Sequence, residues 1–205
     1  MNNILLRAKH WQLFMIVFVI PMVFYVGIMG LMIANIANDT PDPSIIISYF
    51  PVFLLLMIFT GSVQFGWFWA VGVGLNKVIP PELKLNVKRF KLAFLLVVIA
   101  IFGWVYFMWS LMRSVTLVSQ NNYNPAITGL MIPCMFLLIV AVFYIYYFVA
   151  RTLRTAELKR AINVGDYIGE FFLIYFFPIG IWFLQPKINK LVDGELSRDT
   201  LIDVL

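Results

Sequence analysis

Two carboxylates near the C-terminus are the residues of this chain best placed to do chemistry. Asp166 and Glu170 lie four residues apart in the sequence NVGDYIGEFF, so a helix would place both on one face. The chain becomes wholly apolar directly after Glu170. Two neighbouring carboxylates that enter a low-dielectric region repel each other and lose hydration, which raises the pKa of at least one of them. The spacing therefore indicates a candidate proton relay or cation site.

A structural role for the same pair is the competing hypothesis. Carboxylates at the start of a helix interact favourably with the helix dipole, and Gly165 followed by Asp166 predicts a helix start with Asp166 as its N-cap. Basic residues shortly before the pair offer ion-pair partners; they are Arg151, Arg154, Lys159 and Arg160. In this hypothesis the carboxylates fix a helix and perform no chemistry.

Gln64 is the third polar candidate, because a polar side chain deep in an apolar segment is costly and marks either a pathway or an interhelical hydrogen bond. Small residues recur every four positions beside it, on one face of a helix: Ser62, Gly66, Ala70 and Gly74. This helix-packing face predicts the close approach of a second helix, from the same chain or from another copy. A pore lining is the alternative.

Few other chemistries remain open to this chain. It has one Cys, Cys134, and one His, His10, so an intrachain disulfide and zinc sites built from several Cys or His are excluded. None of the signatures GxSxG, HExxH, GxGxxG or the P-loop occurs. We therefore predict no catalytic residues, no metal and no cofactor, and a protein that is not an enzyme.

The composition indicates the environment in which the chain folds. Of the 205 residues, 62% are hydrophobic and 12% are charged, and the mean hydropathy is +0.93. Soluble domains have roughly 45–50% apolar and ~25% charged residues. A soluble globule of this size could not bury so much apolar surface. The chain is therefore predicted to be an integral membrane protein.

Four charge-free stretches of more than 20 residues divide the chain. Each is long enough for a helix to cross a hydrocarbon core about 30 Å thick, and a single segment satisfies its backbone in lipid only as a helix. The predicted transmembrane helices are 11–34, 45–75, 92–112 and 127–150. The first is too long for the apolar run of a signal peptide and is expected to be retained, with a kink at Pro21.

The C-terminal segment 166–186 interrupts this pattern. The charge-free run between Glu170 and Lys187 is shorter than a span, and Pro178 removes a backbone donor near its centre. These features favour a short re-entrant or interfacial segment, broken by proline, over a fifth crossing that includes Glu170. The predicted fold class is thus an all-α integral membrane protein with four transmembrane helices and a broken C-terminal segment.

The basic residues are distributed unevenly between the loops. Before the C-terminal segment, eleven Lys and Arg fall on one side of the predicted membrane, and Arg113 alone on the other. The positive-inside rule therefore places the N-terminus in the cytoplasm, with 1–186 as a single polytopic domain and 187–205 as a cytoplasmic tail. This distribution explains the net charge of +5, which therefore does not indicate nucleic-acid binding. The basic loops are expected to contact anionic lipid head groups.

Between Gly165 and Asn189 the sequence is dense in Pro, Gly, Trp and Gln. The distinctive elements are Gly165-Asp166, Glu170-Phe171, Phe177-Pro178-Ile179-Gly180-Ile181-Trp182 and Gln185-Pro186. In these elements the segment, 25 of 205 residues, resembles the C-terminal part of small, uncharacterised polytopic membrane proteins of bacteria. That family has no assigned activity. The resemblance implies a multi-pass protein of the plasma (bacterial inner) membrane and no specific function.

Two functional hypotheses follow from these observations. The first is a non-enzymatic scaffold, accessory subunit or oligomeric membrane component, whose partners are membrane lipids and either further copies of itself or a larger membrane complex. The alternative is a small transporter or channel with Gln64 and Glu170 in its path.

Overall fold

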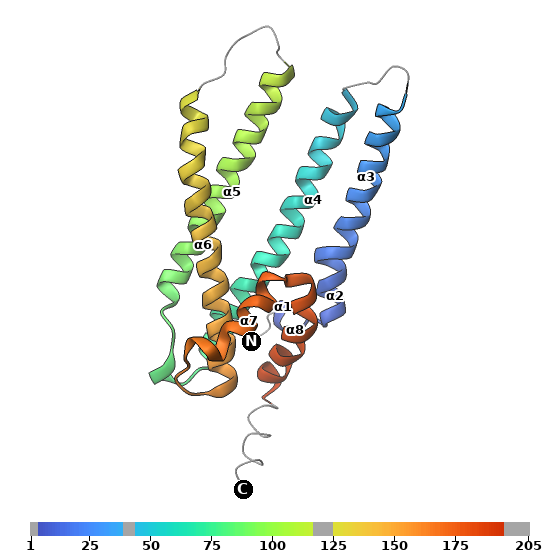
Figure 1. Ribbon diagram of the computed structural model, residues 1–205. Helices are drawn as coiled ribbons and strands as arrows, with labels where there is room; N and C mark the ends of the chain where they lie inside the picture. Colours follow the sequence, from blue (N-terminus) through green and yellow to red (C-terminus); the bar gives the residue numbers. More distant parts are fainter. Residues whose placement is uncertain (1–3, 39–43, 117–124, 195–205) are drawn as a thin grey trace. The chain divides into compact units, whose positions relative to one another are not determined.

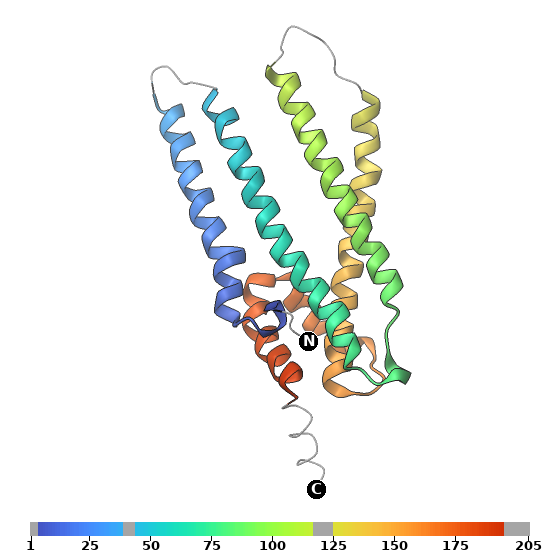
Figure 2. The ribbon, with the colours of Figure 1, turned by 180° about the vertical axis from the view of Figure 1, so that it is seen from behind.

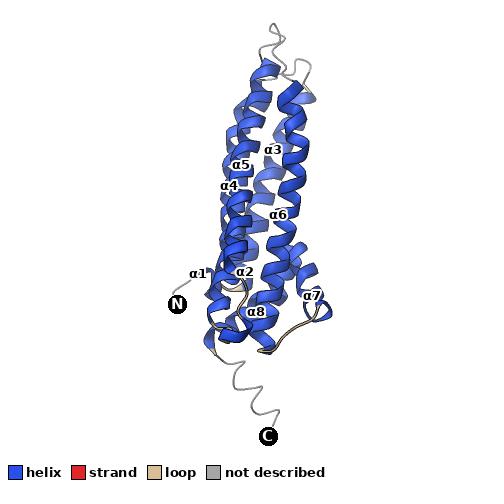
Figure 3. Cartoon of the chain, turned by 90° about the vertical axis from the view of Figure 1, so that its left-hand side faces the viewer, coloured by secondary structure: helices blue, strands red, loops and turns tan. Residues whose placement is uncertain are grey.

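The computed structural model of the protein describes residues 4–38, 44–116 and 125–194, and within them every regular element is a helix (Figure 3). The α-helices are α1 (Ile4–Arg7), α2 (His10–Phe14), α3 (Ile20–Ile36), α4 (Ser44–Trp69), α5 (Val87–Thr116), α6 (Pro125–Leu158), α7 (Val164–Tyr175) and α8 (Phe177–Asp193). Single turns of π-helix occur at Met15–Val19 and Ala70–Gly74, and 3-10 turns at Leu75–Lys77 and Pro81–Leu83.

Four stretches of helix in the described chain are long and apolar enough to cross a membrane. They are His10–Ile36, Ser48–Lys77, Val87–Met108 and Pro133–Leu158, with 22 to 30 residues each. At 1.5 Å per residue even the shortest is about 33 Å long, which exceeds the thickness of the hydrocarbon core. Each overlaps one of the four predicted spans, so the all-helical membrane fold with four spans is confirmed.

The first span contains an irregularity close to Pro21. The chain passes from α2 through the π-helical turn Met15–Val19 into α3, whose first turn contains Pro21. Proline has no N–H to donate to the carbonyl four residues earlier, so the regular α-helical ladder cannot continue through it. Single π-helical turns are a common response to such an interruption. The sequence predicted a kink at Pro21, and the structure has a π-helical turn directly before α3.

The chain divides into two compact units. Unit 1 contains residues 1–85 and 149–205, and unit 2 contains residues 86–148. In unit 2, α5 and the first part of α6 run side by side as an antiparallel pair (Figure 2). The rings of Phe90 and Phe148 stack with their centroids 4.6 Å apart and join the two helices at the end where α5 begins.

In unit 1, α3 lies beside α4, and the short helices α1, α2, α7 and α8 gather at one end of this pair (Figure 1). Aromatic contacts hold this end together. Trp67 of α4 meets Phe177 of α8 with ring centroids 5.3 Å apart, and His10 of α2 meets Trp182 of α8 at 4.7 Å. The C-terminal helices therefore pack on both the first span and the second.

The segment that the sequence predicted to be broken is a hairpin of two helices. The backbone leaves the α-helical region at Phe176 (φ −90°, ψ 56°), and Pro178 follows in the first turn of α8, where its missing N–H costs nothing. Gly180 then lies so close to α7 that a Cβ atom there would overlap the carbonyl group of Leu173. Glycine at this position is what allows the two helices to fold back on each other.

The two ends of this hairpin differ from the prediction in detail. The N-cap of α7 is Asn163, and Asp166 is the third residue of the helix, so the prediction of Asp166 as N-cap is wrong. Asn163 is an equally good N-cap residue, and Asp166 instead reaches back one turn, where its Oδ2 accepts a hydrogen bond from the Asn163 N–H at 2.9 Å. At the other end, α8 continues to Asp193, beyond the boundary predicted for the tail.

Candidate functional site

Asp166 and Glu170 both lie on α7, but they have different partners. Asp166 Oδ1 accepts a hydrogen bond from Arg160 Nη2 at 3.0 Å. Glu170 Oε1 lies 3.2 Å from Lys187 Nζ and 3.8 Å from Arg154 Nη1. Arg154 and Arg160 are two of the four basic residues anticipated as partners, so ion pairing, on which the structural hypothesis depends, is present for both carboxylates.

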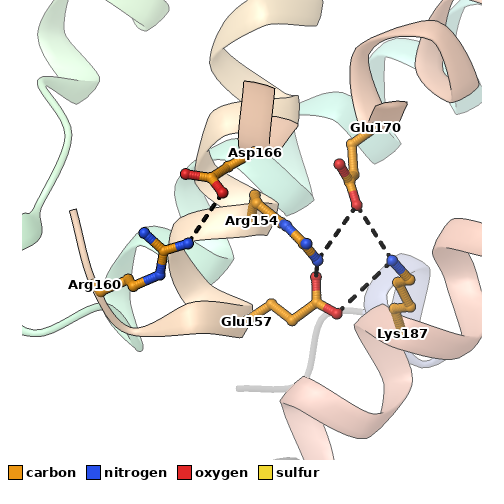
Figure 4. A network of polar contacts seen from close by, with 6 residues as sticks. All are labelled: Arg154, Glu157, Arg160, Asp166, Glu170 and Lys187. Carbon is orange, nitrogen blue, oxygen red and sulfur yellow. Dashed lines mark hydrogen bonds and ion pairs between the residues drawn. The ribbon is translucent and has the colours of Figure 1, made fainter. Parts of the chain in front are cut away.

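Glu170 belongs to a closed set of four charged side chains, Arg154, Glu157, Glu170 and Lys187, which we call the charged ring (Figure 4). Arg154 Nη1 donates to Glu157 Oε2 at 2.7 Å, and Lys187 Nζ lies 3.7 Å from Glu157 Oε1. Each acid therefore contacts both bases, and each base contacts both acids. The ring joins the end of α6 to α7 and α8 with no net formal charge.

The charged ring is sheltered on one side and open on the other. The side chain of Glu170 is 8% exposed, whereas that of Lys187 is 38% exposed. Ion pairs shielded from water interact more strongly than exposed ones, but only where each charge has a partner. Here all four do. The charged ring therefore serves to hold three helices together. A cation or a mobile proton at Glu170 would have to displace Lys187 or Arg154.

The pKa of Asp166 is lowered, so Asp166 is not a carboxylate with the raised pKa expected of at least one of the pair. The hydrogen bond from the backbone N–H of Asn163, together with the nearby guanidinium of Arg160, holds the pKa of Asp166 below its ordinary value of 3.8. Both interactions favour the ionised carboxylate. Asp166 is therefore suited to capping α7 and is a poor proton donor near neutral pH.

The helix-packing face is covered at one end by the chain itself. Ala70 and Gly74 are buried, and a Cβ atom added at Gly66 would lie 3.2 Å from Leu5 Cδ1 of α1. Ser62, at the other end of the face, is exposed, and Gln64 is half-buried. Close packing within the chain thus accounts for the part of the face nearest α1.

A polar site that the sequence did not reveal lies at Gln185. This fully buried residue of α8 accepts a hydrogen bond from Trp67 Nε1–H of α4 at 2.7 Å through Oε1. Its Nε2 group lies within hydrogen-bonding distance of the carbonyl oxygens of Leu5 (3.2 Å), Leu6 (3.2 Å) and Ala8 (2.9 Å). These carbonyls lie at or next to the C-terminal end of α1. The last carbonyl groups of a helix receive no hydrogen bond from the helix itself and need another donor. Gln185 thereby joins three segments.

A signal for this site was present in the sequence. Gln185 is a polar residue at the end of a long apolar run, whereas Gln64 lies deep inside one. Trp67 lies in the second predicted span, and its buried N–H requires an acceptor. The sequence could not show that these two residues meet, because 118 positions separate them.

Two cavities accompany these features. An apolar groove of about 620 Å³ runs between α5 and α6 in unit 2. A polar recess of about 240 Å³ in unit 1 is lined by the basic residues Lys84, Arg151 and Arg160, among others. Neither cavity is lined by Gln64 or Glu170. Among the described residues, no three His, Cys, Asp or Glu side chains are grouped as metal ligands.

Comparison with known proteins adds no functional assignment. No family model matches the chain, and no curated protein or solved structure is significantly similar to it. The function must therefore be inferred from the residues and their arrangement.

Proposed function

We propose that this integral membrane protein is a non-enzymatic component of the bacterial inner membrane that acts as a scaffold, an accessory subunit or a homo-oligomer. The main support for this proposal is that most side chains of the four spans are not buried within the chain. Only 6% to 28% of the residues in the most apolar 18-residue stretch of each span are buried. Large side chains such as Leu55, Phe102 and Tyr106 are 67%, 70% and 71% exposed. Such surface is available to lipid and to the helices of other subunits.

The polar groups support a structural role as well. The charged ring and Gln185 are both occupied in joining helices, and each has its partners within the chain. Catalysis would need a reactive group with an acid, base or metal partner beside a space for substrate. Polar networks that join several helices instead fix one arrangement of those helices.

The orientation in this proposal follows from charge and from one contact. Gln185 of α8 lies within hydrogen-bonding distance of the carbonyls of Leu6 and Ala8, and this contact supports a common side of the membrane for the N-terminal segment and the C-terminal hairpin. Four spans, an even number, return the chain to the side of the membrane on which it started. The excess of Lys and Arg on that side makes it the cytoplasmic one.

The transporter hypothesis makes a different demand. It requires Gln64 and Glu170 to line a continuous path, whereas Glu170 contacts Lys187 and Arg154 and lines neither cavity. Flux through proteoliposomes distinguishes the two hypotheses. We expect no flux of monovalent cations or protons above that of empty vesicles. Flux that falls in Glu170→Gln and in Gln64→Ala would favour the transporter.

Two differently tagged copies of the chain, expressed together and purified in mild detergent, test the scaffold proposal. One tag is used for capture, and the other is detected in the eluate. Light scattering then gives the mass of the protein component. We expect the second tag to be retained, or a stoichiometric partner protein to remain bound through gel filtration. A strict monomer of 23.7 kDa with no bound protein would contradict the proposal.

A further inference from the structure

The groove between α5 and α6 is apolar along its described walls and has the charged residue Arg89 at one end. Its walls include Leu92, Leu96 and Gly103 of α5 and Leu138 and Ala141 of α6. Its volume of about 620 Å³ lies within the range of small-molecule sites. All of its lining residues belong to unit 2.

Small residues create the space in this groove. Ala93, Ala100, Gly103 and Ala141 line it in positions where a larger side chain would fill it. A Cβ atom added at Gly103 would meet no atom within 4 Å. The groove is therefore an open volume along the helices, and α5 and α6 do not close over it by packing against each other.

Among the described residues that line the groove, Arg89 alone is charged. It lies in the first turn of α5, which is the end that the basic loop places at the cytoplasmic membrane surface. Within the described part of the chain its guanidinium makes no hydrogen bond or ion pair. A cation without a protein partner at the end of an apolar groove complements an anionic head group attached to a hydrocarbon chain.

The length of the groove fits a lipid of one leaflet. From Arg89 to Gly103, α5 advances about 21 Å at 1.5 Å per residue. One leaflet contributes half of a hydrocarbon core about 30 Å thick. The groove therefore begins at the membrane surface and continues through the cytoplasmic leaflet.

We propose that this groove binds one anionic phospholipid of the cytoplasmic leaflet, with the head-group phosphate on Arg89 and one acyl chain against Leu92, Leu96 and Gly103. The apolar walls select a hydrocarbon chain, and Arg89 selects a negative head group. This site requires only that the protein spans a membrane. It does not depend on the scaffold role.

Native mass spectrometry of the delipidated protein in mild detergent, with added dioleoyl phosphatidylglycerol or dioleoyl phosphatidylcholine, tests the site. We expect tighter binding of phosphatidylglycerol. Arg89→Gln should weaken its binding roughly fivefold, the effect of one basic residue near a membrane surface. Lys88→Gln is the matched control, because Lys88 is exposed in the same turn but does not line the groove. Equal binding of both lipids, or equal effects of both variants, would overturn the proposal.

A second pair of variants tests the acyl-chain part. Gly103→Leu fills the groove and should reduce the binding of both lipids, whereas Gly27→Leu in α3, which is also free of close neighbours, should not. Circular dichroism and gel filtration verify that each variant is folded. Unchanged binding by Gly103→Leu would overturn the proposal. So would a disulfide between two copies at Cys134, which lines the groove, because a second copy would then be its occupant.

Discussion

The indole N–H of Trp67 donates a hydrogen bond of 2.7 Å to the side-chain oxygen of Gln185, and both residues are completely buried. This bond joins the second span to the C-terminal hairpin. Because the amide nitrogen of Gln185 also faces the carbonyls at the end of α1, one side chain holds the N-terminal segment, α4 and α8 together.

Gln185→Ala should destabilise the protein by several kcal/mol. The substitution leaves the Trp67 N–H and at least one carbonyl of α1 buried without a partner, and each such group costs about 1–3 kcal/mol. Gln185→Glu should also destabilise it, because a carboxylate would then face the carbonyl oxygens. Thermal unfolding in mild detergent measures both effects.

A double-mutant cycle isolates the bond itself. Trp67→Phe keeps an aromatic ring against Phe177 but removes the donor, and Gln185→Met keeps the volume but removes the acceptor. We expect the two substitutions together to cost less than the sum of the single costs, by about 0.5–3 kcal/mol. Strict additivity would show that the bond contributes nothing.

Gly180→Ala should prevent the close packing of α7 on α8. The added methyl group overlaps the Leu173 carbonyl, and overpacking of this kind costs typically about 1–3 kcal/mol or more. Gly169→Ala on α7 is the control, since its Cβ would meet nothing, and it should stabilise the helix by up to about 1 kcal/mol. Denaturant unfolding compares the two. Equal stability of both variants would refute the close approach at Gly180.

The sequence predicted the membrane fold well and the polar contacts only in part. Hydrophobic length predicted the four spans, and Pro178 marked the broken C-terminal segment, because both are local properties of the chain. The pairing of Glu170 with Arg154 could be predicted, because these residues lie on the consecutive helices α7 and α6. Contacts of Gln185 with Leu6 and Trp67 depend on packing between distant segments, which no local pattern encodes.

Glu170→Gln should destabilise the hairpin because it removes one acid from the charged ring. Lys187 and Arg154 would then share Glu157 alone, and we expect a loss of about 1–3 kcal/mol, limited by the partial exposure of Lys187. The exchanged double variant Glu170→Lys/Lys187→Glu should recover part of this loss. Glu82→Gln, in the exposed 3-10 turn, is the neutral control. Equal stability of Glu170→Gln and wild type would contradict the ring.

The contribution of Asp166 to stability should disappear in acid. Because folding lowers its pKa below 3.8, the ionised form stabilises the folded state. The stabilisation is therefore complete above 3.8 and is lost as the pH falls through the folded-state value. The difference in melting temperature between wild type and Asp166→Asn should be positive at pH 6 and shrink steadily as the pH falls below 3.8. A difference that does not change with pH would contradict the capping role.

Cysteine accessibility in oriented membrane vesicles tests the arrangement of spans most directly. After Cys134→Ser, single cysteines are placed at Asn38, Glu82, Lys159 and Asp193, all exposed positions outside the apolar parts of the spans. An impermeant maleimide should label positions 82, 159 and 193 from the cytoplasmic side and position 38 from the opposite side only. Labelling of position 193 from the same side as position 38 would mean that the α7–α8 hairpin crosses the membrane, and would contradict the four-span arrangement.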